Sequence, residues 1–124
     1  MWEEVTHGII GCAMQVHRTL GNGFLELIYQ RAMELEMAAK GIAFEREKEL
    51  PIHYLGEEIG VTRVDFLIEG NVMVELKAVS RLDEIHIAQV LNYLKTYQKP
   101  VGLLINFGAK SLEFKRMHNH KLVE

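Results

Sequence analysis

Three charged side chains, Asp65, Glu75 and Lys77, are the residues whose types and spacing could do chemistry. They lie in a stretch, residues 62–79, in which two runs of alternating apolar and polar residues flank a short connection centred on Gly70. Alternation of this kind predicts two β-strands, and a short connection containing glycine and asparagine predicts a hairpin. The charged residues are therefore expected on two neighbouring strands.

The apolar residues of the hairpin select its register. With Gly70 at the apex, Phe66 faces Val74 and Val64 faces Leu76, so the apolar partners share one face of the sheet. A shift by one residue would mix apolar and charged residues on both faces, which sheet packing disfavours. We therefore predict the register that has Gly70 at the apex.

This register brings Asp65 opposite Glu75, with Lys77 two residues further along the same face. Directly opposed residues have Cβ atoms roughly 4.5–5.5 Å apart, and two carboxylates so close raise each other's pKa unless a positive charge lies beside them. Mg²⁺ satisfies this need with carboxylate and water oxygens. Lys77 could then contact an attacking water or a phosphate oxygen. Taken alone, the hairpin leaves open a solvated strand face that merely carries Asp, Glu and Lys.

Two helices are expected to precede the hairpin. Helical spacing of apolar residues predicts a first helix that stops at residues 21–23, and a second from Phe24 to about Lys40. Glu26 lies in the first turn of the second helix, where a carboxylate interacts favourably with the helix dipole, and Tyr29 follows three residues later. The apolar stripe expected to face the core on this helix consists of Leu25, Ile28, Ala32, Leu35 and Ala39.

The remaining elements complete an α/β pattern. Residues 42–54 alternate loosely as a strand whose Pro51 suggests an edge or a bulge, and residues 55–58 are expected to turn into the hairpin. A third helix is predicted from Glu84 to about Gln98, with Ile87, Val90, Leu91 and Leu94 inward and with His86, Gln89 and Tyr93 on a neighbouring stripe. Strands at 101–107, covered on both sides, and at 111–117 follow.

Length and composition predict one domain, residues 1–124, with a mixed central β-sheet in the element order ααβββαββ. The net charge of −3 lacks the basic excess of a strong nonspecific nucleic-acid binder, so phosphate contacts must come from a local patch or a metal. A single cysteine, Cys12, excludes an internal disulfide and fits a reducing compartment as a buried apolar residue. An acidic N-terminus and the absence of a membrane-length apolar run favour a cytoplasmic protein without a membrane partner.

A family resemblance covers nearly the whole chain, from about Leu20 to Arg116. Residues 23–29 have the pattern G-x-x-E-x-x-Y, and the chain resembles the small bacterial and archaeal GxxExxY proteins, which are grouped within the PD-(D/E)xK nuclease superfamily. Asp65, the triplet 75–77, Gln89 with Tyr93, and the strand 102–108 also fit the resemblance. One departure is Gly21-Asn22-Gly23, where family members often carry Gly-Pro-Gly.

The resemblance implies a restriction-endonuclease-like core and a metal site. Mg²⁺, or Mn²⁺, would be held by Asp65, Glu75 and the backbone carbonyl of Leu76. Glu26, from the helix before the sheet, would complete this shell or recruit a second ion. Lys77 would orient or deprotonate water. Gln89 would approach the same site from the third helix, with Tyr29 and Tyr93 as supporting residues.

The function implied is Mg²⁺-dependent hydrolysis of phosphodiester bonds in DNA, with RNA the less favoured substrate. The alternative is a noncatalytic nucleic-acid- or protein-binding module that retains the nuclease fold. An intact set of Asp65, Glu75 and Lys77 favours the enzyme, whereas the mildly acidic charge and small size favour the module. They would also fit a homodimer, or a partner protein that supplies substrate binding.

Overall fold

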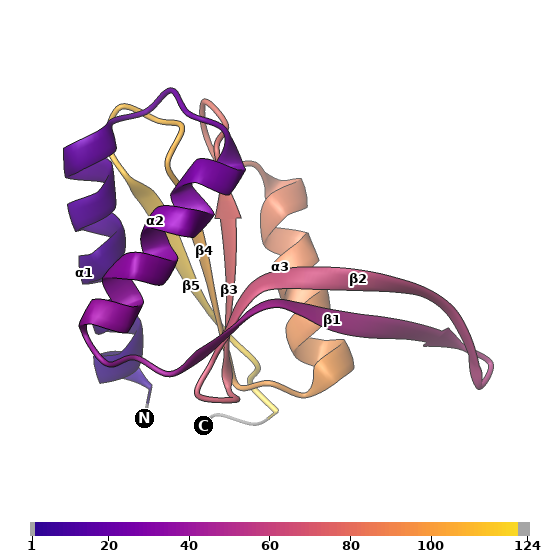
Figure 1. Ribbon diagram of the computed structural model, residues 1–124. Helices are drawn as coiled ribbons and strands as arrows, with labels where there is room; N and C mark the ends of the chain where they lie inside the picture. The colour runs from indigo at the N-terminus through magenta and orange to yellow at the C-terminus, as the bar shows by residue number, and fades with distance from the viewer. Residues whose placement is uncertain (1, 122–124) are drawn as a thin grey trace.

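The computed structural model describes residues 2–121, which form a five-stranded sheet between helices (Figure 1). The order ααβββαββ predicted from the sequence is confirmed. The elements are α1 (Glu3–Leu20), α2 (Glu26–Ala39), β1 (Phe44–Tyr54), β2 (Glu57–Ile68), β3 (Val72–Lys77), α3 (Glu84–Tyr97), β4 (Val101–Asn106) and β5 (Glu113–His118).

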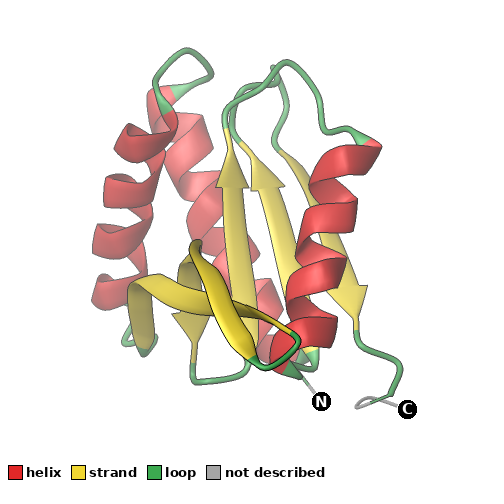
Figure 2. Ribbon diagram, turned by 90° about the vertical axis from the view of Figure 1, so that its right-hand side faces the viewer, coloured by secondary structure: helices red, strands yellow, loops and turns green. Residues whose placement is uncertain are grey.

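The sheet is mixed, as expected, and its strands lie side by side in sequence order. Only β3 and β4 run parallel, and α3 makes the crossover between them; the other neighbouring pairs are antiparallel. Helices α1 and α2 cover one face and α3 covers the other (Figures 1 and 2). All of β4 is buried, because it lies inside the sheet with a helix layer on each face.

The predicted register of the β2–β3 hairpin is confirmed over its first three pairs. Phe66 lies opposite Val74, and the pairing continues to Ile68 opposite Val72. The turn takes positive φ at Glu69 and Gly70, and Asn71, to which the sequence interpretation gave that freedom, does not need it.

The expected facing of Val64 and Leu76 is wrong, because the β2–β3 ladder ends at Phe66. Strand β2 bends away from β3 at Asp65. At the matching position of the neighbouring strand β1, Glu47 has a positive φ of 50°. Val64 consequently packs into the core beneath α3, whereas Leu76 and Phe66 pack beneath α1 and α2. The bend opens the sheet at the position of Asp65.

The apolar stripe predicted for α2 is also wrong in its orientation. Leu25, Ile28 and Leu35 are 80%, 45% and 75% exposed, and Ala39 is exposed too, whereas Ala32 of the predicted stripe does pack against the core. The buried residues of the helix are Tyr29, Gln30, Met33 and Met37. The α1–α2 connection holds the Tyr29 hydroxyl, which fixes the rotation of the helix about its axis. Because residues four apart share a helix face, the methionines that follow Tyr29 at this spacing are buried with it.

The expected inner face of α3 needs a smaller correction. Val90 and Leu94 are buried and Ile87 is half-buried, but Leu91 is 39% exposed. Tyr93 is buried in its place. The helix begins with a capping box formed by Asp83 and His86. The His86 side chain of the predicted stripe therefore caps the helix.

The β1–β2 hairpin projects beyond the helices as a curved ribbon (Figure 1). Its tip is the two-residue turn at Leu55 and Gly56, both with positive φ, so the turn is shorter than the expected 55–58 and Glu57 already belongs to β2. As Pro51 suggested, β1 is an edge strand, and its register shifts between Ile52 and His53. Within residues 2–121, no helix is long and apolar enough to span a membrane.

Candidate active site

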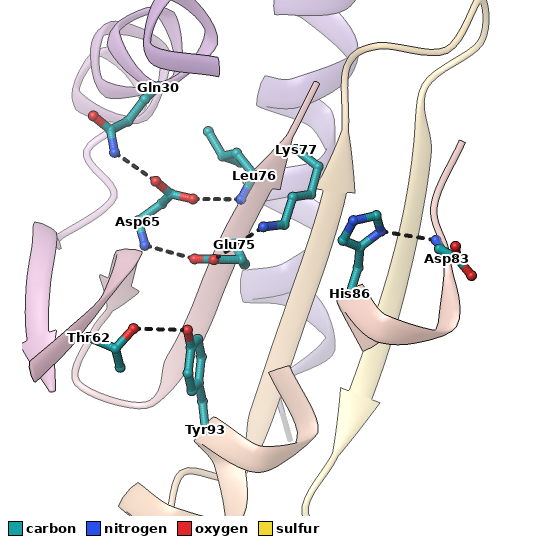
Figure 3. A network of polar contacts seen from close by, with 9 residues as sticks. All are labelled: Gln30, Thr62, Asp65, Glu75, Leu76, Lys77, Asp83, His86 and Tyr93. Carbon is teal, nitrogen blue, oxygen red and sulfur yellow. Dashed lines mark hydrogen bonds and ion pairs between the residues drawn. The ribbon is translucent and has the colours of Figure 1, made fainter. Parts of the chain in front are cut away.

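Asp65 and Glu75 occupy the point where β2 leaves β3. The backbone N–H of Asp65 donates to Glu75 Oε1 over 3.2 Å, and the N–H of Leu76 donates to Asp65 Oδ2 over 2.7 Å (Figure 3). Each acidic side chain thus accepts an amide hydrogen that the ended ladder would otherwise leave unpaired, which is costly in a buried position. The two acidic residues lie close together as predicted, but Asp65 and Glu75 are not a pair of the β2–β3 ladder; they meet through these hydrogen bonds, which also complete the hydrogen bonding of the sheet.

Burial perturbs both acids. It raises the pKa of Glu75 to about 8, with the charge of Asp65 as the second cause. Burial also raises the pKa of Asp65, although hydrogen bonds from the Leu76 amide and the Gln30 side chain oppose that rise. The Lys77 ammonium, 3.9 Å from Glu75 Oε2, favours ionisation of both acids without cancelling the effect of burial. Without a bound cation, the pair therefore holds a proton near neutral pH.

Lys77 ends β3 with a side chain that is 18% exposed. Its strand end is fixed by the buried Asn106, which lies opposite it on β4. The Asn106 amide accepts from the N–H groups of Val79 and Gly108 and donates to the Val79 carbonyl and to Glu113. A Cβ on Gly108 would lie 2.3 Å from the Val79 carbonyl oxygen. Sequence reasoning missed Asn106, although one polar residue within an apolar run was a usable signal.

Gln30 is a second residue that sequence reasoning missed. It is buried, and its Nε2 donates to Asp65 Oδ1 over 2.8 Å (Figure 3). Its own Oε1 accepts from Arg46 Nη1, and Arg46 is paired with Glu34. This chain of contacts ties α2 and β1 to the carboxylate. The available signal was the spacing from Glu26, since positions four apart on a helix share a face.

Glu26 lies near the pair without joining it. It begins α2, is exposed, and lines a depression of about 170 Å³ together with Gln30, Glu47 and Asp65. Partial burial, and secondly the charge of Asp65, raise the pKa of Glu26. Among residues 2–121, no three His, Cys, Asp or Glu side chains converge closely enough to hold an ion. Glu26 would have to move toward Asp65 to share a ligand.

Tyr29 positions the start of α2. Its hydroxyl donates to the Gly21 carbonyl over 2.6 Å and accepts from the N–H groups of Gly23 and Phe24. Its ring stacks on Phe107 with centroids 4.6 Å apart. The tyrosine of the G-x-x-E-x-x-Y pattern thus fixes the connection that carries Glu26.

The two α3 residues differ in how they relate to the site. Tyr93 is buried, and its hydroxyl lies 3.2 Å from Thr62 Oγ1, so it holds β2 just before the bend (Figure 3). Gln89, one turn earlier, is half-buried. Among residues 2–121, no hydrogen bond joins Gln89 to the carboxylate pair. The two carboxylates accept hydrogen bonds from the backbone amides of Asp65 and Leu76 and from the Gln30 side chain.

The oxygen donors at the bend fit a hard divalent cation. Each carboxylate oxygen has two lone-pair positions, so one amide hydrogen bond leaves capacity for a ligand bond. In an extended strand the N–H and C=O of one residue point toward the same neighbour. The Leu76 carbonyl therefore faces the Asp65 side, where the β2 ladder has ended. Two carboxylates and a carbonyl suit Mg²⁺ or Mn²⁺.

The core is a mixed α/β sheet that opens at a pair of acidic residues beside a lysine, which is the arrangement that the family resemblance implies. Residues 3–117 match the family described as the PD-(D/E)XK nuclease superfamily, and the chain belongs to that superfamily. The crystal structure of SSO0001 resembles this fold with a TM-score of 0.61 and 18% sequence identity. That likeness covers 74% of this chain and 48% of SSO0001, so the chain spans less than half of that protein. Among curated proteins, none matches the chain.

Proposed function

We propose that this chain is a GxxExxY protein that hydrolyses phosphodiester bonds of DNA with Mg²⁺ or Mn²⁺. The observation that carries the proposal is the meeting of Asp65, Glu75 and Lys77 at the bend of β2. Superfamily membership supports nucleic acid as the substrate class. DNA is preferred to RNA on the family resemblance.

Asp65, Glu75 and the Leu76 carbonyl would hold the cation. The chemistry that such an ion would supply is polarisation of the scissile phosphate and stabilisation of charge on the leaving oxygen. Lys77 stands beside Glu75 with its side chain 18% exposed, where its ammonium can orient a water or contact a phosphate oxygen. Glu26 lines a depression together with Asp65 and is proposed to join the metal site when substrate binds. Gln89 is proposed to contact substrate from α3.

Cleavage assays with variants that preserve the fold test this proposal. Glu75→Gln keeps an oxygen to accept the Asp65 N–H, and Lys77→Met keeps the length of the aliphatic side chain. We expect the wild type to cleave DNA in Mg²⁺ or Mn²⁺ and both variants to lose activity by orders of magnitude, because they remove groups that act in the transition state. Lys77→Arg should also fail, since a planar guanidinium cannot replace a compact ammonium.

The matched control is Lys115→Met on the exposed face of β5, which removes an equal charge away from the bend. Calorimetry with Mn²⁺ should show that Lys77→Met still binds the ion. Equal cleavage by wild type and Lys77→Met across a panel of DNA and RNA substrates would overturn the assigned mechanism.

A noncatalytic binding module remains the second candidate. The hydrogen bonds that Asp65 and Glu75 make to the backbone favour it, because they give both acids a structural reason to be present. This candidate is supported if the purified chain cleaves nothing in either metal yet binds DNA, RNA or a partner protein.

A further inference from the structure

The distal part of the β1–β2 hairpin, residues 51–61, is called the arm. It projects from the body of the protein with no helix layer on its faces (Figures 1 and 2). Four of its apolar side chains, Tyr54, Leu55, Ile59 and Val61, are 65%, 87%, 65% and 51% exposed. A two-stranded ribbon without a covering layer is marginally stable in water, and clustered exposed apolar residues mark interaction sites.

The charge of the arm indicates the chemistry of its partner. From residue 50 to residue 62 the sequence contains Glu57 and Glu58 but neither lysine nor arginine. Phosphate groups would be repelled, so the arm does not have the character of a nucleic-acid ribbon. The charge and exposed apolar residues of the arm would suit a partner surface that is apolar at its centre and basic at its rim.

Such a surface lies on the same chain, on the side of α3 away from the arm. An open groove of about 390 Å³ runs between α3 and the residues that follow β5. Leu91 and Leu94 line it together with Lys95, His118 and Lys121. Because Leu91 is 39% exposed and the lysines flank it, the groove combines apolar area with positive charge.

The arm is unsuited to pairing by its edge. Pro51 lacks a backbone N–H, and the register shift between Ile52 and His53 distorts the outer strand. Both features blunt edge-to-edge strand addition. These features disfavour strand addition at the β1 edge, and the exposed apolar side chains of its faces and tip are the surface through which we expect the arm to dock.

The base of the arm and the groove flank the same end of α3. The Tyr97 hydroxyl donates to the Pro51 carbonyl over 2.8 Å, which fixes the arm to the last turn of the helix. On the other side, Lys95 and Gln98 line a hollow that also includes Asn119 and Lys121. A two-fold axis near this helix end can therefore place each arm over the groove of a second copy, which closes a symmetric pair.

We propose that two copies of this chain form a symmetric dimer in which the arm of each docks in the groove of the other. Leu55 and Tyr54 cover the apolar floor around Leu91, while Glu57 and Glu58 face Lys95 and Lys121. This inference does not depend on the proposed nuclease activity.

Light scattering during size-exclusion chromatography, over a range of concentrations, tests the dimer. Wild type should be a dimer, and Leu55→Asp should be a monomer with unchanged circular dichroism, because it places a charge at the apolar contact. The matched control is Leu35→Asp, on α2 at a position 75% exposed against 87% for Leu55, which should remain dimeric. A monomeric wild type, or a dimer that survives Leu55→Asp, would overturn the proposal.

Exchange of charges tests the pairing of arm with groove. Glu57→Lys with Glu58→Lys should weaken self-association by about tenfold or more, and so should Lys95→Glu with Lys121→Glu, because like charges then meet at the rim. An equimolar mixture of the two variants should restore a dimer containing one copy of each. Failure of the mixture to dimerise would overturn the arm-to-groove assignment. A monomeric wild type whose DNA binding is lost in Leu55→Asp would assign the arm to nucleic acid instead.

Discussion

Glu75 couples the stability of the protein to pH. Its folded-state pKa of about 8 lies above the ordinary value of 4.5, so the folded state keeps a proton that the unfolded state loses. The stabilisation is present in full below about pH 4.5 and is lost as the pH rises through about 8. We expect the melting temperature in EDTA to fall from about pH 6 to about pH 9. Glu75→Gln should flatten that fall, and an identical slope in both proteins would contradict the assignment.

A divalent cation should reverse this loss. Because an ion that binds only the folded state stabilises it by mass action, Mg²⁺ or Mn²⁺ should raise the melting temperature most at alkaline pH. Near neutral pH, binding should also displace the proton held by the pair. Calorimetric titration in buffers of different ionisation enthalpy measures the number of protons released when the ion binds. Equal, undetectable binding by wild type and Glu75→Gln would remove the metal site.

Gln30 should act on the site through Asp65. Gln30→Ala removes a hydrogen bond to a partly buried carboxylate and the Gln30 acceptor of Arg46 Nη1, while Arg46 keeps its ion pair with Glu34. We expect a loss of about 1–3 kcal/mol in the free energy of unfolding, together with weaker Mn²⁺ binding. Gln15→Ala, on the exposed side of α1, is the control. Unchanged Mn²⁺ affinity in Gln30→Ala would show that the contact does not position Asp65.

Residue types and spacing were enough to predict that Asp65, Glu75 and Lys77 converge, because a hairpin register follows from its hydrophobic pattern. They could not predict the long-range contacts of Gln30 and Asn106. Gln30 contacts Asp65, 35 positions away in the chain, and Asn106 contacts Val79, 27 positions away, and no periodicity reports contacts of that range.

At the scale of elements, Tyr29 should control the entry into α2. Tyr29→Phe keeps the ring stacked on Phe107 but removes one hydrogen bond that the hydroxyl donates and two that it accepts. We expect a loss of about 1–3 kcal/mol in the free energy of unfolding, and faster amide exchange at residues 21–25. Tyr54→Phe, on the exposed arm, should change neither quantity. Unaltered exchange in Tyr29→Phe would show that the loop is held by other contacts.

Element order and sheet class were predictable from turn signals and periodicity, but the orientation of α2 was not. Its leucines and isoleucine suggested one face, whereas Tyr29 and the methionines form the buried one. The bend of β2 was not predictable either. Val64 continues the alternation of the sequence, yet its side chain packs into the core beneath α3. A local pattern cannot report where two strands separate.

For the molecule as a whole, stability should decrease from β4 toward the arm. Strand β4 is buried throughout and paired on both edges, whereas the arm has a single ladder and no covering layer. Hydrogen exchange under monomeric conditions should therefore be slowest at residues 101–106 and fastest at residues 51–61. Protection of the arm equal to that of β4 would contradict this gradient.

The hydrogen bonds at the bend of β2 have a consequence for how this chain could lose a catalytic function. Asp65 and Glu75 each accept a partly buried backbone hydrogen, so replacing either would weaken the sheet even in a descendant under no selection for cleavage. Among the contacts within residues 2–121, the Lys77 side chain accepts no backbone hydrogen, and its contact with Glu75 is an ion pair of 3.9 Å. A descendant that became inactive should therefore retain both acids while its lysine drifted. Among divergent copies of this gene, we expect the lysine, more than the acids, to separate enzymes from their inactive relatives.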